Sequence, residues 1–294
     1  MQNMYTAQLK PSQYPDIQLD INPYCNARCE FCGYHGMTRK KSPMKKQLFT
    51  KIIDEISLWE TNKVGNGIEI VPTFYGEFFL NPEWKRYLSY ISDNLPKCRI
   101  AIPTNGSRIT PETIEFLAGI PNLTYMNFSI YYTSPEEYEK RIGLPRETMT
   151  TSLEMARQLR KLRPDIKVIV GTTNDPRFCT NPDQNIRILE EQWGESDVGV
   201  HPITRNHSHG GYVRPYPSCT PCASLFVRTF ILNDGRVTTC CFDPNAEIIY
   251  GDVNRDSIYD IWHGVTANAI RTAHAEGRRD EIPICKSCDQ FAWR

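Results

Sequence analysis

Three cysteines near the start of the chain constrain its fold more than any other feature. Cys25, Cys29 and Cys32 are separated by three and by two residues, so one short loop supplies three thiolates. A cubane [4Fe–4S] cluster takes four cysteine ligands. A set of three leaves one iron open to another molecule, as a catalytic metal site does. The spacing alone also allows a zinc site or part of a disulfide framework.

A second group of cysteines lies in the last third of the chain. A hairpin is expected around the turn Asn233-Asp234-Gly235, with strands at 226–232 and 236–242. Such a hairpin brings the cysteines at its two ends together, and a later C-x2-C pair places two more sulfurs on one metal centre. We therefore predict four thiolate ligands here, with a zinc ribbon as the alternative: Cys222, Cys240, Cys285 and Cys288.

The first cysteine run resembles the signature of the radical S-adenosylmethionine (AdoMet) enzymes. The second set, with Asp234-Gly235, Gly251-Asp252-Val253 and Ile261-Trp262, resembles the SPASM/twitch extension of many of these enzymes, in its single-cluster form. The resemblance implies two [4Fe–4S] clusters and AdoMet as cofactors. In that family the open iron holds AdoMet, and an electron from the cluster cleaves it to a 5′-deoxyadenosyl radical.

The composition agrees with an intracellular globular enzyme. The 294 residues carry no net charge, which provides no electrostatic case for nucleic acid or an anionic membrane as a partner. No apolar run approaches the length of a membrane span, and the first residues lack the features of a secretory signal. The eleven cysteines are therefore interpreted as reduced thiols and cluster ligands, and a cytoplasmic location is expected.

Strand and helix patterns alternate between residues 17 and 203, which predicts a parallel sheet with helical crossovers. Six such units are too few for a full eightfold barrel. The family resemblance implies a partial (β/α)6 TIM-like barrel at residues 1–211, followed by a small α+β iron–sulfur domain at 212–294. The expected strands are residues 17–21, 67–74, 99–103, 125–130, 167–172 and 198–203. In barrels of this kind the active site lies at the carboxyl ends of the strands.

The loops at those ends carry the residues that the resemblance assigns to AdoMet. The family motif Gly-Gly-Glu appears here as Tyr75-Gly76-Glu77, so its first glycine is replaced. Tyr131-Tyr132 stands where relatives often carry Asp-Gly. Phe31 is placed to lie beside a bound planar ring. The expected cofactor contacts are Phe31, Tyr34, Gly76, Glu77, Asn105, Ser129, Gly171 and Ile203.

Two polar segments are candidates for binding a substrate. The run after the sixth expected strand holds Arg205, His207 and His209, a density of donors that suits a polar molecule, although a solvated linker is the alternative. The basic run at residues 39–46 is expected to be a solvated, mobile loop, with binding of an anionic substrate group as the less favoured interpretation.

The first motif does not determine the fate of the substrate radical after hydrogen abstraction. An auxiliary cluster favours oxidation of that radical, with a flavodoxin or ferredoxin as external reductant. Epimerisation would need a thiol as hydrogen donor, and Cys179 and Cys241 are the candidates, with Arg205 and His207 as further catalytic candidates. We expect a small polar substrate, such as a carbohydrate, aminocyclitol or nucleoside. Peptide modification and a non-catalytic electron carrier or zinc scaffold are the alternatives.

Overall fold

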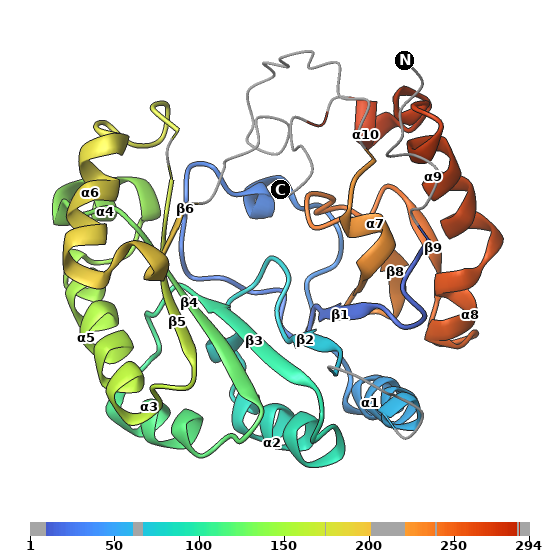
Figure 1. The fold of residues 1–294 in the computed structure, drawn as a ribbon, viewed down its shortest axis with the longest axis horizontal. Helices are drawn as coiled ribbons and strands as arrows, with labels where there is room; N and C mark the ends of the chain where they lie inside the picture. The colour runs from blue at the N-terminus through green and yellow to red at the C-terminus, as the bar shows by residue number, and fades with distance from the viewer. Residues whose placement is uncertain are drawn as a thin grey trace.

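The computed structural model describes residues 10–60, 67–173, 175–200, 221–238, 240–286 and 288. Within these ranges the strands form a single sheet in the order β6-β5-β4-β3-β2-β1-β7-β8-β9. Figure 1 shows this sheet curving around an open side, with helices on its outer surface. The fold is mixed α/β, as expected.

The first six strands run parallel and lie side by side in chain order, which confirms the predicted partial barrel. Apolar residues of β1 to β5 are buried on one or both faces, as parallel strands between helices require. The strands are β1 (Asp16–Leu19), β2 (Glu69–Val71), β3 (Arg99–Thr104), β4 (Leu123–Tyr131), β5 (Lys167–Thr172) and β6 (Val198–Val200).

The crossover helices bury one apolar stripe each against the outer face of the sheet (Figure 1). Ile52, Ile53 and Ile56 of α1 are completely buried. Thr110 caps α3, because its hydroxyl accepts a hydrogen bond from Thr113 N at 3.3 Å. The helices are α1 (Lys46–Glu60), α2 (Trp84–Asn94), α3 (Pro111–Ala118), α4 (Pro135–Ile142), α5 (Arg146–Leu162) and α6 (Pro182–Trp193). Short 3-10 turns η1 (Gly33–Gly36), η2 (Phe78–Leu80) and η3 (Glu195–Asp197) lie between them.

Helix α4 was not among the predicted elements. Ser134 caps its first turn by accepting from Glu137 N at 3.2 Å, and Gly143 ends it with φ of 72°. Both are ordinary helix-terminus signals. The helix is short and mostly charged, so its apolar periodicity is weak. Its carboxyl end contacts the first cysteine loop.

The C-terminal strands extend the barrel sheet. β7 runs parallel to β1, with Ile17 opposite Thr229, and then pairs antiparallel with β8. The predicted hairpin therefore exists, and it is joined edge to edge with the barrel. The remaining elements are α7 (Ser224–Val227), β7 (Arg228–Ile231), β8 (Arg236–Thr238), β9 (Ile249–Asp252), α8 (Ile258–His263), α9 (Val265–Ala275), η4 (Arg279–Glu281) and α10 (Pro283–Lys286).

The first predicted hairpin strand was too long at both ends, and the second was too long at its carboxyl end only. Phe226 belongs to a helical turn, since its N–H donates to Ala223 O at 3.0 Å and its ring is buried. In the loop that leads to β9, Asp243 accepts a hydrogen bond from Glu247 N at 2.9 Å. Side-chain hydrogen bonds of this kind compete with the strand that the β-rich sequence predicted.

The predicted domain boundary at residues 211 and 212 lies outside the described residues, as does the end of the sixth expected strand beyond Val200. In the described part of the chain, no helix combines the length and apolar character needed to cross a membrane.

Candidate active site

The first cysteine set lies in the loop between β1 and α1, at the carboxyl ends of the barrel strands. Two backbone hydrogen bonds join this loop to the end of α4. Arg28 N donates to Ile142 O at 2.6 Å, and Glu30 N donates to Arg141 O at 3.0 Å. The unpredicted helix therefore determines the path of the chain between Cys25 and Cys32.

The three sulfur atoms of this loop are largely shielded from water. Burial raises the pKa of Cys25 to about 11, and the charges of Glu77 and Cys32 add to the rise. Burial also raises the pKa of Cys32, and that of Cys29 well above its usual range. Neighbouring thiolates in such a site require a compensating cation. The donor set therefore fits an iron–sulfur cluster, whose iron atoms supply that charge.

Tyr34 stiffens the loop around the cysteines. Cys25 N donates to its hydroxyl oxygen at 3.3 Å, and its own N–H donates to Cys32 Sγ at 3.4 Å. The ammonium group of Lys41 lies 4.0 Å from the centroid of the Tyr34 ring. The ring is thus held beside the cysteine set, and its contact with AdoMet stays a prediction.

Phe31 packs among aromatic rings from two other loops. Its ring centroid lies 4.6 Å from that of Tyr131 and 5.9 Å from that of Phe178. Tyr131 has a positive φ of 65°, at a register shift where β4 leaves β5. A tyrosine in this conformation costs free energy that the surrounding structure must supply, and such strain clusters at functional sites. Tyr131 is the first residue of the Tyr131-Tyr132 pair, which stands where the resemblance predicts Asp-Gly.

Gly76 and Glu77 lie against the first cysteine loop. A side chain at Gly76 would place its Cβ 1.8 Å from Asn22 O, so only glycine fits. The buried carboxylate of Glu77 accepts from Thr104 Oγ1 at 2.9 Å and from Asn105 N at 2.7 Å. Burial raises the pKa of this carboxyl group. Glu77 thus joins the loop after β2 to the loop after β3.

Asn105 connects the loop after β3 to the cysteine loop. Its side-chain amide donates to Asn26 Oδ1 at 3.0 Å and lies 3.8 Å from Cys25 Sγ. Ser129 on β4 and Gly171 on β5 are direct register partners. The structure therefore brings these predicted cofactor contacts to one end of the sheet. Ile203, Arg205 and His207 lie outside the described residues.

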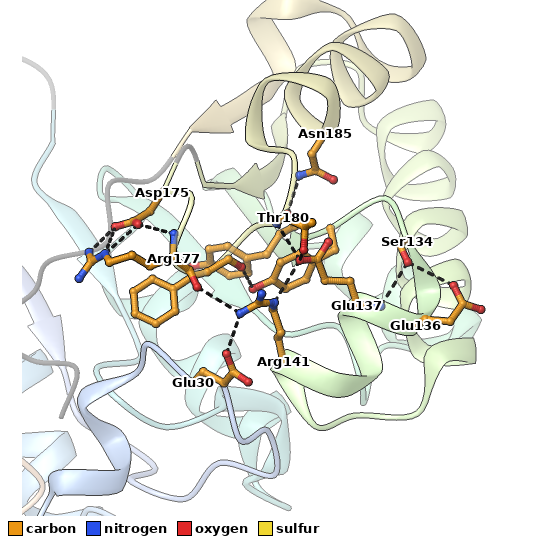
Figure 2. A network of polar contacts seen from close by, with 12 residues as sticks. Glu30, Ser134, Glu136, Glu137, Arg141, Asp175, Arg177, Thr180 and Asn185 are labelled. Carbon is orange, nitrogen blue, oxygen red and sulfur yellow. Dashed lines mark hydrogen bonds and ion pairs between the residues drawn. The ribbon is translucent and has the colours of Figure 1, made fainter. Parts of the chain in front are cut away.

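A network of ion pairs and hydrogen bonds joins the cysteine loop to the loop after β5, and Figure 2 shows Arg141 at its centre. Arg141 donates to Glu30 at 2.9 Å, to Glu137 at 3.0 Å and to the carbonyl of Arg177 at 3.2 Å. Glu137 also accepts from Thr180 N at 2.9 Å. Arg141 was not among the predicted site residues because helix α4 was not predicted.

The two candidate thiols have different surroundings. Cys179 is 1% exposed and is part of the hydrophobic core, where burial raises its pKa. Cys241 is partly exposed and hydrogen bonds with Cys240. Cys241 is therefore the more exposed of the two thiols, whereas Cys179 is buried within the loop between β5 and α6.

The predicted ligands of the second cysteine set come from three separate segments of the chain, and their assignment to a cluster stays a prediction. Burial raises the pKa of Cys285 to about 12, and the charges of Cys240, Cys288 and Cys222 add to the rise, so these thiols lie close together. Cys240 Sγ accepts from Phe242 N at 3.2 Å. Four partly buried thiols of this kind fit the full cysteine ligation of a [4Fe–4S] cluster. Among the described side chains, no group of three His, Cys, Asp or Glu is arranged to hold a single metal ion.

Tyr75 lies close enough to cysteines of both sets for their charges to affect its hydroxyl group. It follows β2 and takes the place of the first glycine of the family motif. Burial raises the pKa of its hydroxyl group well above the usual range, and the charges of Cys241, Cys32, Cys240 and Asp243 contribute. One side chain is thus influenced by cysteines of both sets. The tyrosine is visible in the sequence, but its proximity to both sets is not.

Comparison with known proteins gives the family. The model of the Radical SAM superfamily matches residues 19–176, just over half of the chain. The chain belongs to the radical SAM superfamily. Residues 219–289 match the SPASM model, an iron–sulfur cluster-binding domain. This radical SAM protein is therefore a redox enzyme with AdoMet and [4Fe–4S] clusters as cofactors, in agreement with the two cysteine sets.

Individual relatives share the whole length of the chain at low identity. The S-adenosyl-L-methionine-dependent 2-deoxy-scyllo-inosamine dehydrogenase of Niallia circulans is 22% identical over 277 residues, which cover 94% of this chain and 93% of that protein. The crystal structure of BtrN with AdoMet and 2-DOIA has a TM-score of 0.61 at 18% identity and covers 96% of this chain and 95% of its own. The anSMEcpe structure with AdoMet and the Cp18Cys peptide has a TM-score of 0.67 at 11% identity, covering 93% and 87%. The two structures establish the fold.

Proposed function

We propose that this radical SAM enzyme removes hydrogen from a hydroxyl-bearing carbon of a small polar compound and oxidises that carbon to a carbonyl. The observation that carries the proposal is the pairing of β1 with β7, which joins the loop of Cys25, Cys29 and Cys32 and the region of the second cysteine set in one sheet. A substrate held at the first set would then share a sheet with the proposed electron acceptor. The similarity to an aminocyclitol dehydrogenase over nearly the whole chain supports the same substrate class.

The proposal assigns Cys25, Cys29 and Cys32 to a cluster with an open iron, and the four C-terminal cysteines Cys222, Cys240, Cys285 and Cys288 to an auxiliary cluster. When bound, these groups and AdoMet supply a 5′-deoxyadenosyl radical for hydrogen abstraction and an acceptor for the second electron. The alcohol then loses a hydrogen atom, a proton and an electron in all. A flavodoxin or ferredoxin is proposed as the external electron donor.

The residues of this chain would position AdoMet and exclude water. The loops after β2 and β3 are joined through Glu77, and the paired positions Ser129 and Gly171 offer a hydroxyl group and bare backbone at the adjoining strand ends. The packed rings of Phe31 and Tyr131 form an apolar wall beside the first cysteine set. A radical intermediate needs such a closed and dry environment.

A second candidate is stereochemical inversion, with Cys241 returning a hydrogen atom to the substrate radical. The partly exposed position of Cys241 near Tyr75 favours it over the core residue Cys179 for this role. Peptide modification, as the peptide complex of anSMEcpe illustrates for that protein, has no comparable support from the described residues.

The test is a screen for substrate-dependent release of 5′-deoxyadenosine by the anaerobically reconstituted enzyme. Polyols, aminocyclitols, nucleosides and short peptides are compared in D2O with dithionite as reductant. A ketone product without solvent deuterium supports the proposal, and an isomer with one deuterium supports inversion. A cross-linked or methylated peptide would contradict both.

A further inference from the structure

Arg39 is buried, contrary to the expectation of a solvated basic loop. Its guanidinium group lies 2.6 Å from the carboxylate of Asp20, and both side chains are almost fully covered. It also donates to Asn233 Oδ1 at 2.7 Å and to Pro244 O at 2.8 Å. Arg39 therefore contacts the end of β1, the hairpin turn and the loop that follows Cys240 and Cys241.

The neighbours of Arg39 repeat this connection. Thr38 donates to Asn245 Oδ1 twice, from its backbone N–H at 2.7 Å and from its hydroxyl at 3.1 Å. Asn245 in turn donates to Gly36 O at 3.2 Å, and Asn233 donates to Ser42 O at 2.7 Å. The segment 36–42 is thus bound along its length to the two C-terminal loops.

Both ends of this connection are close in the chain to proposed cluster ligands. On one side, Met37 N donates to Tyr34 O at 3.2 Å, and Tyr34 N donates to Cys32 Sγ at 3.4 Å. On the other side, Asp243 N donates to Cys240 O at 3.2 Å, directly before Pro244 and Asn245. A rigid path of hydrogen bonds therefore runs from the first cysteine set to the second.

We infer that an inter-loop clamp fixes the distance between the two cysteine sets. The clamp consists of Thr38 and Arg39 on one side and of Asn233, Pro244 and Asn245 on the other. Its residues are positioning residues, since none lies among the proposed ligands. The inference rests on the proposed function, because electron transfer from substrate to the second set falls steeply with distance. A loosened clamp would let AdoMet be cleaved without product formation.

The buried ion pair is a poor first target. Removing Arg39 alone leaves the Asp20 carboxylate buried without its partner, which destabilises proteins strongly. Asn245 is more suitable because its contacts to Thr38 are exposed hydrogen bonds. Asn254 is a matched control, since it is an asparagine of the same region whose amide bonds only to Asp234 O and Asp252 in the described structure.

The experiment compares Asn245→Ala and Asn254→Ala in the cluster-loaded enzyme. Backbone hydrogen exchange across residues 36–42 should be about tenfold faster in Asn245→Ala, because the Thr38 amide loses its acceptor, and unchanged in Asn254→Ala. The iron content should equal that of the wild type in both. The ratio of 5′-deoxyadenosine to oxidised product should rise several-fold in Asn245→Ala alone.

The outcomes separate the clamp from the proposed function. Unchanged exchange at residues 36–42 would overturn the clamp, and faster exchange with an unchanged product ratio would overturn its coupling role. If the wild-type enzyme yields no oxidised product, the proposed function fails and the exchange result alone decides whether the clamp exists.

The double variant Arg39→Met with Asp20→Leu leaves no buried charge. It should also raise the hydrogen exchange rate of residues 36–42 and the ratio of 5′-deoxyadenosine to oxidised product. Wild-type behaviour of both quantities in a folded double variant would contradict the role of Arg39.

Discussion

At the scale of single residues, Glu77 illustrates a buried carboxyl group whose described partners are neutral donors: Thr104, Asn105 and Phe79. Burial is the largest influence on it and raises its pKa above the ordinary value of 4.5. The folded protein therefore holds a proton on Glu77 at pH values where the unfolded chain has released it.

This protonation predicts the pH dependence of stability. The free energy of unfolding contributed by Glu77 is largest below pH 4.5 and decreases as the pH rises toward the raised pKa. The side chain of Glu77→Gln does not titrate. As the pH rises through this window, the free energy of urea unfolding of the wild type should therefore fall relative to that of Glu77→Gln. A constant difference between the two proteins would mean that Glu77 keeps its ordinary pKa.

Gly76 predicts a steric effect at the same loop. Gly76→Ala would bring Cβ to 1.8 Å from Asn22 O, so the backbone must move and the first cysteine loop with it. We expect a loss of stability of about 1–3 kcal/mol and weaker AdoMet binding. Thermal unfolding and AdoMet titration measure the two effects. Gly119→Ala is the control, because its nearest neighbour, Phe116 O, is at an ordinary 3.4 Å.

At the scale of elements, helix α4 supports the active-site loops through Arg141 (Figure 2). Its carboxyl end also supplies the backbone acceptors for Arg28 and Glu30. The helix thus holds the first cysteine loop on one side and the loop after β5 on the other. Its function depends on its position, and its own core contribution is limited to residues such as Tyr138 and Ile142.

Arg141→Ala should therefore slow catalysis more than Arg146→Ala, a substitution at a neighbouring arginine. Loss of its hydrogen bonds to Glu30 and Glu137 is expected to cost about 1–2 kcal/mol of stability and to slow AdoMet cleavage severalfold. Arg146→Ala removes only exposed ion pairs with Glu136 and Glu139 and should stay within about 0.5 kcal/mol of the wild type. Equal effects of the two variants on cleavage would contradict the supporting role of α4.

At the scale of the whole molecule, the edge pairing of β1 with β7 makes the two iron–sulfur regions parts of one sheet. The first cysteine set follows β1, and the second lies around β7 and β8. The pairing of β1 with β7 thus sets the approximate arrangement of the two sites, and the inter-loop clamp is proposed to fix the distance between them.

The two sites should nevertheless bind iron independently. Replacing Cys25, Cys29 and Cys32 with alanine should abolish 5′-deoxyadenosine formation and leave about four iron atoms per chain at the second set. Iron analysis and deoxyadenosine assays after anaerobic reconstitution measure this. Cys98→Ala, a change at a buried thiol far from both sets in the chain, should keep about eight iron atoms. Cleavage of AdoMet by the triple variant would refute the assignment of the first set.

The sequence by itself determined the chemistry and the order of the barrel. The range of β5 follows from local periodicity and was predicted correctly. The spacing of Cys25, Cys29 and Cys32 needs only a local loop, and the C-x2-C pair and the hairpin turn likewise predict the second set from local sequence.

Only the tertiary structure decided which distant segments meet. The pairing of β1 with β7 and the burial of Arg39 against Asp20 both join residues that local patterns treat separately. A basic run is solvated by default, because burying a charge requires a partner that the local sequence does not reveal. Here that partner lies at the end of another strand, which explains why a surface loop in the sequence became a structural link between the two sites.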